Sequence, residues 1–268
     1  MTSETNETSD EAIQEIDLNC DAGESYGHWT MGDDETLIPL MTSVSIACGA
    51  HAGDPLVMRQ TLLLATQHHV AVGAHPGYPD LHGFGRRVIP LSADEVEAWT
   101  LAQLGTLDAM ARGVGAILRH VKPHGALYNT AADDETLAAA VVRAVRAFNS
   151  DLALVARAGS RMVSVAREAG LRVAEEAFID RGYDSEGRLL SRTHPNALVS
   201  DPRVAADRAV RLLQMGTLVA ADGATLRIRP QTLCVHSDTK GAAAIASAVR
   251  TALSTAGIAL RPLHELAQ

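Results

Sequence analysis

Short apolar segments of the strand type alternate with longer helix-like segments about seven times along the chain. This alternation predicts parallel strands, because two parallel neighbours can be joined only by a long crossover connection such as a helix. No change in composition marks a linker, so we expect one (β/α) barrel domain over residues 13–268, after a disordered acidic tail at residues 1–12. Seven strands are one fewer than the usual eight, which predicts a distorted barrel.

Several of the expected helices carry local start signals. Asp54-Pro55 and Asp201-Pro202 each combine an N-cap carboxylate with a proline at the first helical position. The expected helices cover residues 33–41, 55–67, 92–112, 133–149, 159–170, 202–215 and 242–255. The expected strands cover residues 15–20, 43–47, 70–72, 116–122, 152–156, 171–177 and 231–236, with a short further strand at 258–263.

Charge and composition exclude some partners. The net charge of −9 and the lack of any apolar run of transmembrane length argue against nucleic acid and membrane as partners. Three cysteines, Cys20, Cys48 and Cys234, form no close pair, which favours reduced thiols and a cytoplasmic location. Aromatic residues make up only 3% of the chain, so the core is expected to be aliphatic.

Polar side chains gather where the expected strands end. Because the carboxyl ends of barrel strands meet at one mouth, these side chains should line one pocket. The loop at residues 73–87 carries a histidine, a carboxylate and paired arginines, and His120, Lys122 and His124 share one strand face. The candidates at strand ends are Asp17, Asn19, Asp21, Glu24, His51, His75, His124, Glu175, His236 and Asp238.

This set of imidazoles and carboxylates suits general acid–base hydrolysis, and its residue types also suit a divalent metal. We assign no metal ligands, because the histidines come from separate loops and no local His-x-x-x-His helix motif is present. The common glycine-rich nucleotide-binding motifs are missing as well. Lys122 and Lys240 are the only lysines in a chain that otherwise uses arginine, which points to a role for Lys122 that needs its ammonium group.

Six motifs resemble the LamB/YcsF family of 5-oxoprolinase A subunits and occur in that family's order, and the resemblance covers roughly residues 16–263. Two departures stand out: Ser45 replaces the family's usual asparagine, and Ser237 replaces a usual glycine, which bears on the turn before Asp238. The motifs are Asp17-Leu18-Asn19-x-Asp21-x-Gly23-Glu24, Ile46-Ala47-Cys48-Gly49-x-His51-Ala52-Gly53-Asp54-Pro55, Gly73-Ala74-His75-Pro76, Val121-Lys122-Pro123-His124-Gly125-Ala126-Leu127-Tyr128-Asn129, Asp180-Arg181-Gly182-Tyr183 and Cys234-Val235-His236.

The resemblance implies a barrel related to polysaccharide deacetylases and glycoside hydrolases. It also implies ATP-dependent cleavage of 5-oxo-L-proline to L-glutamate, with subunits B and C as partners. The ATP would bind on the partner subunits or be shared with them, with Mg²⁺ as its companion. Two alternatives stay open: a metal-dependent amidohydrolase or deacetylase that acts without ATP, and a non-catalytic subunit of a lactam-utilising complex.

Within this interpretation, Asp17 or Asp21 is the general base, and His75 and His124 carry protons. Lys122 and Arg87 hold phosphate or the substrate carboxylate. The other residues expected to bind substrate are Asn19, Glu24, His51, Glu175, Arg181, His236 and Asp238.

Overall fold

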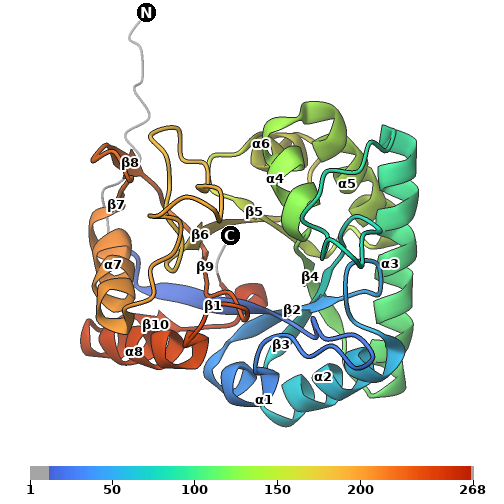
Figure 1. Cartoon of the computed structure of the whole chain (residues 1–268), viewed down its shortest axis with the longest axis horizontal. Coiled ribbons are helices and arrows are strands. Elements are labelled where there is room, and N and C mark those ends of the chain that lie inside the picture. The colour runs from blue at the N-terminus through green and yellow to red at the C-terminus, as the bar shows by residue number, and fades with distance from the viewer. Residues whose placement is uncertain (1–11, 267–268) are drawn as a thin grey trace, which may run out of the picture.

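The computed structural model describes residues 12–266, and seven parallel strands within this range close into a barrel surrounded by helices (Figure 1). Each strand pairs with the next one along the chain, and the seventh returns to pair with the first. The barrel strands are β1 (Glu15–Ala22), β2 (Ser43–Ala47), β3 (Ala71–His75), β4 (Leu118–Val121), β5 (Ala153–Arg157), β6 (Val173–Phe178) and β9 (Thr232–Cys234). The predicted distorted barrel is confirmed, whereas the predicted tail at residues 1–12 lies outside the described residues except for Ala12.

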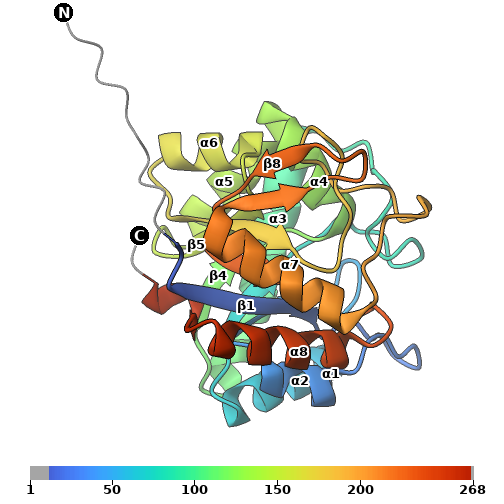
Figure 2. The same cartoon turned by 90° about the vertical axis from the view of Figure 1, so that its left-hand side faces the viewer.

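Helices cover the outside of the barrel, and Figure 2 shows two of them, α7 and α8, side by side along β1. Both Asp-Pro signals act as expected, because Asp54 and Asp201 accept hydrogen bonds from the first backbone amides of their helices. The helices are α1 (Asp34–Leu37), the 3-10 turn η1 (Ile38–Leu40), α2 (Pro55–Gln67), α3 (Ala93–Gly113), α4 (Gly125–Asp133), α5 (Glu135–Phe148), α6 (Arg161–Glu168), α7 (Pro202–Met215), α8 (Ala242–Thr255) and η2 (Leu263–Glu265).

Three short strands lie outside the barrel wall. β10 (Ala259–Leu260) pairs in parallel with the start of β1, which pairs with β9 further along. β7 (Thr217–Val219) and β8 (Thr225–Arg227) form a separate antiparallel hairpin. The sequence did not predict this hairpin, nor the helix α4, which begins directly after Pro123 and His124.

β1 shows how the fold separates an apolar layer from a polar interior. Ile16, Leu18 and Cys20 are fully buried in the aliphatic core between the strands and the helices. Asn19 and Asp21 alternate onto the opposite face, which lines the barrel. Asn19 Nδ2 donates to Glu176 Oε1 at 3.0 Å and to a threonine hydroxyl of β9. The barrel interior is therefore a hydrogen-bonded polar network, and this network supports the mouth.

Across residues 12–266, no helix combines the length and the apolar character that crossing a membrane requires.

Candidate active site

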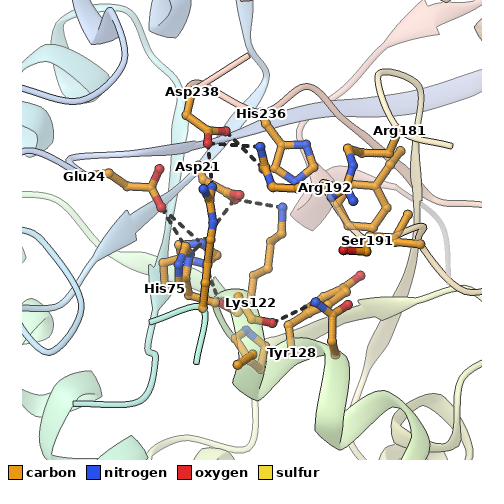
Figure 3. A pocket seen from close by; sticks show the side chains of 18 of the residues that line it. Asp21, Glu24, His75, Lys122, Tyr128, Arg181, Ser191, Arg192, His236 and Asp238 are labelled. Atoms are coloured by element: carbon orange, nitrogen blue, oxygen red, sulfur yellow. Dashed lines mark hydrogen bonds and ion pairs between the residues drawn. The ribbon is translucent and has the colours of Figure 1, made fainter. Parts of the chain in front are cut away.

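A polar cavity of about 340 Å³ opens at the carboxyl ends of the barrel strands (Figure 3). This is the mouth that the strand-end residues were expected to share. Of the candidates named from the sequence, those that line the cavity are Asp21, Glu24, His75, Lys122, His124, Arg181, His236 and Asp238. The other side chains around it include Arg86, Tyr128, Phe178, Ser191 and Arg192.

Lys122 lies at the base of the cavity, and only 2% of its surface is exposed. Its ammonium lies 2.8 Å from Asp21 Oδ1 and 2.8 Å from Glu176 Oε1, and it donates to Asn19 Oδ1 at 3.1 Å. Burial alone would lower the pKa of Lys122, but the charges of its partners, led by Asp21, raise it well above its usual value. Lys122 is thus a fixed cation that compensates two buried carboxylates.

His75 and His124 lie beside this cluster with one nitrogen each facing the other. His75 Nδ1 donates to the carbonyl of Lys122 at 2.6 Å, and His124 Nε2 donates to the carbonyl of Phe84 at 2.8 Å. Because a carbonyl can only accept, these bonds place the proton of each neutral ring on the outer nitrogen. The inner nitrogens, His75 Nε2 and His124 Nδ1, lie 3.0 Å apart.

The carboxylate of Glu24 closes this group. Its Oε1 lies 3.2 Å from His124 Nδ1, 3.9 Å from His75 Nε2 and 3.6 Å from His51 Nε2. Burial would raise the pKa of Glu24, but the neighbouring imidazoles outweigh burial and hold it far below its usual value. Glu24 is therefore ionised at neutral pH.

Burial and neighbouring charges also set the pKa values of the other titratable groups at this end of the barrel. Burial opposes ionisation of Asp21, yet the charges of His75 and Lys122 keep its pKa well below the usual range. Burial would lower the pKa of His75, but the charge and hydrogen bond of Asp21, together with the charge of Glu24, raise it. Burial lowers the pKa of His124, and it lowers that of His51 to about 3. At neutral pH the mouth therefore presents ionised carboxylates beside the neutral rings of His51 and His124.

His51 is buried and packs flat against His124, with ring centroids 3.7 Å apart. Neither of its nitrogens has a hydrogen-bond partner among the described residues. The stacked pair depends on Gly85, whose φ is +63° and whose missing Cβ would lie 2.8 Å from Cδ2 of the His124 ring and 2.8 Å from Cβ of His51. His51, His75 and His124 lie at or after the ends of three different strands, β2, β3 and β4, but the fold brings them together. The absence of a local sequence motif was therefore no argument against a shared site.

His236 and Asp238 follow β9 on the opposite side of the cavity. His236 Nδ1 lies 3.1 Å from Asp180 Oδ1, and Asp180 also accepts from the backbone amide of His236 at 3.0 Å. Ser237, which replaces the expected glycine, has no left-handed backbone conformation. Its hydroxyl instead donates to Glu24 Oε2 at 3.3 Å. The substitution thus adds a contact to Glu24 and does not strain the turn.

Asp238 joins three loops across the rim of the mouth. Its carboxylate contacts Arg86 Nη2 at 2.5 Å and Arg192 at 3.1 Å. Arg86 follows β3, Arg192 lies between β6 and α7, and Asp238 follows β9. Arg181 also lines the cavity, but it donates to the backbone carbonyls of Ala197 and Leu190. Arg181 therefore organises the loop after β6.

Two of the residues expected to bind substrate point away from the cavity. Arg87 pairs with Asp80, and its neighbour Arg86 lines the mouth instead. Glu175 lies on the outer face of β6, where it pairs with Arg167, and Glu176 is the member of the pair that contacts Lys122. Both predictions were therefore wrong by one residue, because the adjacent Arg86 and Glu176 are the ones that face inward.

Asp17 is buried deeper in the barrel, where hydroxyls of Thr42, Ser43 and Thr232 donate to it at 2.7, 2.8 and 2.5 Å. It does not line the cavity, so Asp21 is the one of the two proposed bases that faces the mouth. Asn19 lies below the mouth as a partner of Lys122 and does not contact the cavity.

Sequence reasoning missed Arg86, Tyr128, Glu176 and Arg192. Tyr128 lies on the unpredicted helix α4 and donates to Glu176 Oε2 at 2.7 Å. For Glu176 a signal existed, because Glu175 and Glu176 must face opposite sides of β6 and only one can face inward. Arg192 belongs to a long irregular segment, and no local pattern distinguishes it there.

Comparisons with known proteins agree with one another. The model of the LamB/YcsF family matches residues 16–268. A relative from Chloroflexus aggregans, named as the A subunit of 5-oxoprolinase, is 54% identical over 246 residues, which span 92% of this chain and 98% of that protein. A relative of the same name from Symbiobacterium thermophilum is 50% identical over 248 residues, or 92% and 95% of the two chains. The crystal structure of a lactam utilization protein from Thermus thermophilus has a TM-score of 0.88 and 46% identity, covering 92% of this chain and 99% of that one.

Proposed function

Because the chain belongs to the LamB/YcsF family, we propose that it acts in lactam utilisation as the A subunit of a 5-oxoprolinase. The reaction is the ATP-dependent cleavage of the lactam ring of 5-oxo-L-proline to L-glutamate, carried out together with subunits B and C. The relatives named above support the substrate and the subunit role. A cytoplasmic location fits the same proposal.

The observation that carries the proposal is a small cavity with acid–base groups at its base and arginines at its rim. At about 340 Å³ it lies near the lower end of the usual range for small-molecule sites, roughly 300–1,000 Å³. Arg86 and Arg192 stand where they can receive the carboxylate of a small acid. The inner nitrogens of His75 and His124 mark the point at which a water molecule would be activated.

The cavity fits ATP less well than it fits a small acid. Lys122 is enclosed by Asp21 and Glu176, so its ammonium is already paired. No glycine-rich phosphate loop occurs in the sequence. ATP, with its Mg²⁺, would supply an activated lactam oxygen, and we place its site on the partner subunits or at their junction with this chain. The residues of this chain bind the lactam, exclude bulk water and manage protons around the opened ring.

A second candidate function is metal-assisted hydrolysis of an amide without ATP. The convergence of Glu24, His75 and His124 on one point favours it. The two candidates differ in whether turnover of the lactam requires ATP.

The test measures glutamate and ADP formed from 5-oxo-L-proline, first with the purified chain and then with subunits B and C added. We expect the chain alone to be nearly inactive and the mixture to form both products in equal amounts. His124→Ala should lower turnover of the mixture by ~100-fold or more, the usual scale of lost acid–base help. Full turnover by the single chain would refute the need for partners, and glutamate formed without ATP would favour the second candidate.

A further inference from the structure

We propose that Glu24, His75 and His124 bind one divalent transition-metal ion of the zinc class at the base of the mouth. Their donor atoms, Oε1, Nε2 and Nδ1, lie within 4.8 Å of one another, and all three side chains are buried. They line the cavity, so a bound ion would face it. The inference concerns the cluster itself and does not depend on the lactam activity.

The spacing of the donor atoms fits a small ion. An ion held by tetrahedral bonds of about 2.0–2.1 Å separates its ligand atoms by roughly 3.4 Å. His75 Nε2 and His124 Nδ1 are 3.0 Å apart, and Glu24 Oε1 lies 3.2 Å from the second and 3.9 Å from the first. Shifts of a few tenths of an ångström would bring all three into coordination distance of one point.

The hydrogen bonds behind the cluster prepare both imidazoles for a cation. Each ring uses its outer N–H on a backbone carbonyl, that of Lys122 for His75 and that of Phe84 for His124. Metal-binding histidines usually have this support, which fixes the tautomer and directs the free lone pair at the ion. Two lone pairs 3.0 Å apart cannot hydrogen-bond to each other, so either a proton or a metal ion must lie between them.

A hydrogen bond also orients the carboxylate of Glu24 toward the proposed ion. Ser237 Oγ donates to Glu24 Oε2, which leaves Oε1 facing the two histidines. Oε1 is buried and has no well-formed hydrogen bond among the described residues. A buried carboxylate oxygen without a donor is costly, and coordination of a cation would remove that cost.

A second group with metal-ligating side chains provides a contrast. Asp21, Cys234 and His236 also bring donor atoms within 4.8 Å of one another. There, however, the ammonium of Lys122 lies 2.8 Å from Asp21 Oδ1 and 3.2 Å from Cys234 Sγ. That cation already compensates the site, so a metal ion is not needed and would be repelled.

We do not count His51 among the ligands. Its ring is parallel to that of His124 within 1°, with centroids 3.7 Å apart, and two stacked rings cannot both direct in-plane lone pairs at one ion. With three protein ligands, the ion would keep a position for water on the cavity side, as catalytic zinc sites do. A water bound there is acidified by the ion, which suits hydrolysis of an amide.

The experiment measures zinc binding to the whole chain without reference to catalysis. The protein is freed of metal with a chelator, titrated with Zn²⁺ against a competing indicator, and analysed for bound metal. We expect one ion per chain, with at least about 100-fold weaker binding in Glu24→Gln, His75→Gln and His124→Gln. Two matched controls should bind normally: His82→Gln, an exposed histidine on the same loop as Phe84, and Cys234→Ala in the second group. Circular dichroism verifies that each variant is folded.

Replacement of Zn²⁺ by Co²⁺ gives an independent readout, because the intensity of its visible bands reports the coordination number. An absorption spectrum typical of four or five ligands, lost in Glu24→Gln, supports the site. Failure of the folded parent chain to bind Zn²⁺ would overturn the proposal and leave a proton between the two histidines. Binding that survives in all three ligand variants but is lost in Cys234→Ala would also overturn it, because the ion would then lie beside Lys122.

Discussion

Lys122 is the residue on which the interior of the barrel depends most directly. It is fully enclosed, and the two carboxylates that it contacts, on Asp21 and Glu176, are 6% and 0% exposed. A buried charge that loses its partner is strongly destabilising, because it can reach neither water nor a counter-ion. The sequence indicated a role specific to lysine. The structure supplies a reason, because the buried space beside the two carboxylates fits a compact ammonium group.

We therefore expect Lys122→Gln to lower the free energy of unfolding by about 3–5 kcal/mol. Lys122→Arg keeps the charge but forces a larger planar group into a filled space, which should cost ~1–3 kcal/mol. The other lysine, Lys240, is exposed and makes a matched control, and Lys240→Gln should change stability by less than about 0.5 kcal/mol. Urea denaturation followed by circular dichroism measures all three. Equal, small effects at both lysines would contradict the idea of a compensating buried cation.

Asp17 allows a test of pH dependence. Burial raises its pKa to about 6, although three hydroxyl donors partly offset the effect. The pKa is higher in the folded state than the usual value of 3.8, so the folded protein favours the protonated carboxyl. The stability that this protonated carboxyl contributes is complete below pH 3.8 and is lost as the pH rises through 6. Two pKa units correspond to about 3 kcal/mol.

Asp17→Asn removes this titration, so the parent should lose up to about 3 kcal/mol relative to the variant between pH 4 and pH 7. Asp34 also has a pKa of about 6, but it is present in both proteins and cancels in the difference. Urea midpoints measured at half-unit steps of pH give the two profiles. Parallel profiles would show that folding does not shift the pKa of Asp17.

The errors made from the sequence at the scale of residues have two causes. Arg86 and Arg87, like Glu175 and Glu176, are adjacent residues of the same type, so composition cannot say which one faces inward. Asp17 has the opposite problem, because it shares a strand face with Asp21 but lies four residues away, or about 13 Å along β1. Alternation predicts the face of a side chain, whereas its depth in the barrel depends on how neighbouring strands are staggered.

At the scale of elements, prediction succeeded where the local chemistry is explicit. The bounds of α2 and α7 agree with the expectation, because an aspartate cap and a proline fix each start. The helix α4 was missed, since its cap position is His124, which makes no side-chain capping bond. The β7–β8 hairpin was missed because each strand has only three residues, too few to show a period.

The two aspartate caps are not equivalent, which gives a prediction for these elements. Asp54 caps α2 with Oδ1 and also accepts from the amide of Gly27 with Oδ2 at 2.7 Å, whereas Asp201 caps α7 and otherwise forms only an exposed ion pair with Arg203 of the same helix at 3.6 Å. We expect Asp54→Ala to cost about 1 kcal/mol or slightly more, or ~2–4 °C in melting temperature. Asp201→Ala should lower the melting temperature by less. Thermal unfolding of both variants measures this, and equal shifts would mean that the contact with Gly27 contributes nothing.

At the scale of the whole molecule, closure of the barrel creates the site. The groups that line the mouth come from the carboxyl ends of β1, β3, β4, β6 and β9 and from the segments that follow them, so no single stretch of sequence supplies the site. The sequence predicted this meeting because parallel strands share a carboxyl edge. It could not predict the contacts across the rim, because these depend on the shapes of irregular loops.

The strongest of these rim contacts is Asp238, which ties the loops of Arg86 and Arg192 to its own loop (Figure 3). The two arginines are 36% and 28% exposed, so trypsin can reach them once the loops separate. Loss of charge-assisted bonds of this kind costs ~1–2 kcal/mol and should raise the open population of the mouth roughly 5- to 30-fold. Asp238→Asn should therefore speed cleavage after Arg86 and Arg192 by about that factor. Glu186→Gln is the matched control, because Glu186 pairs with Arg188 within one loop and joins no other. Mass spectrometry of timed digests gives the rates, and equal rates in the two variants would show that Asp238 does not hold the mouth closed.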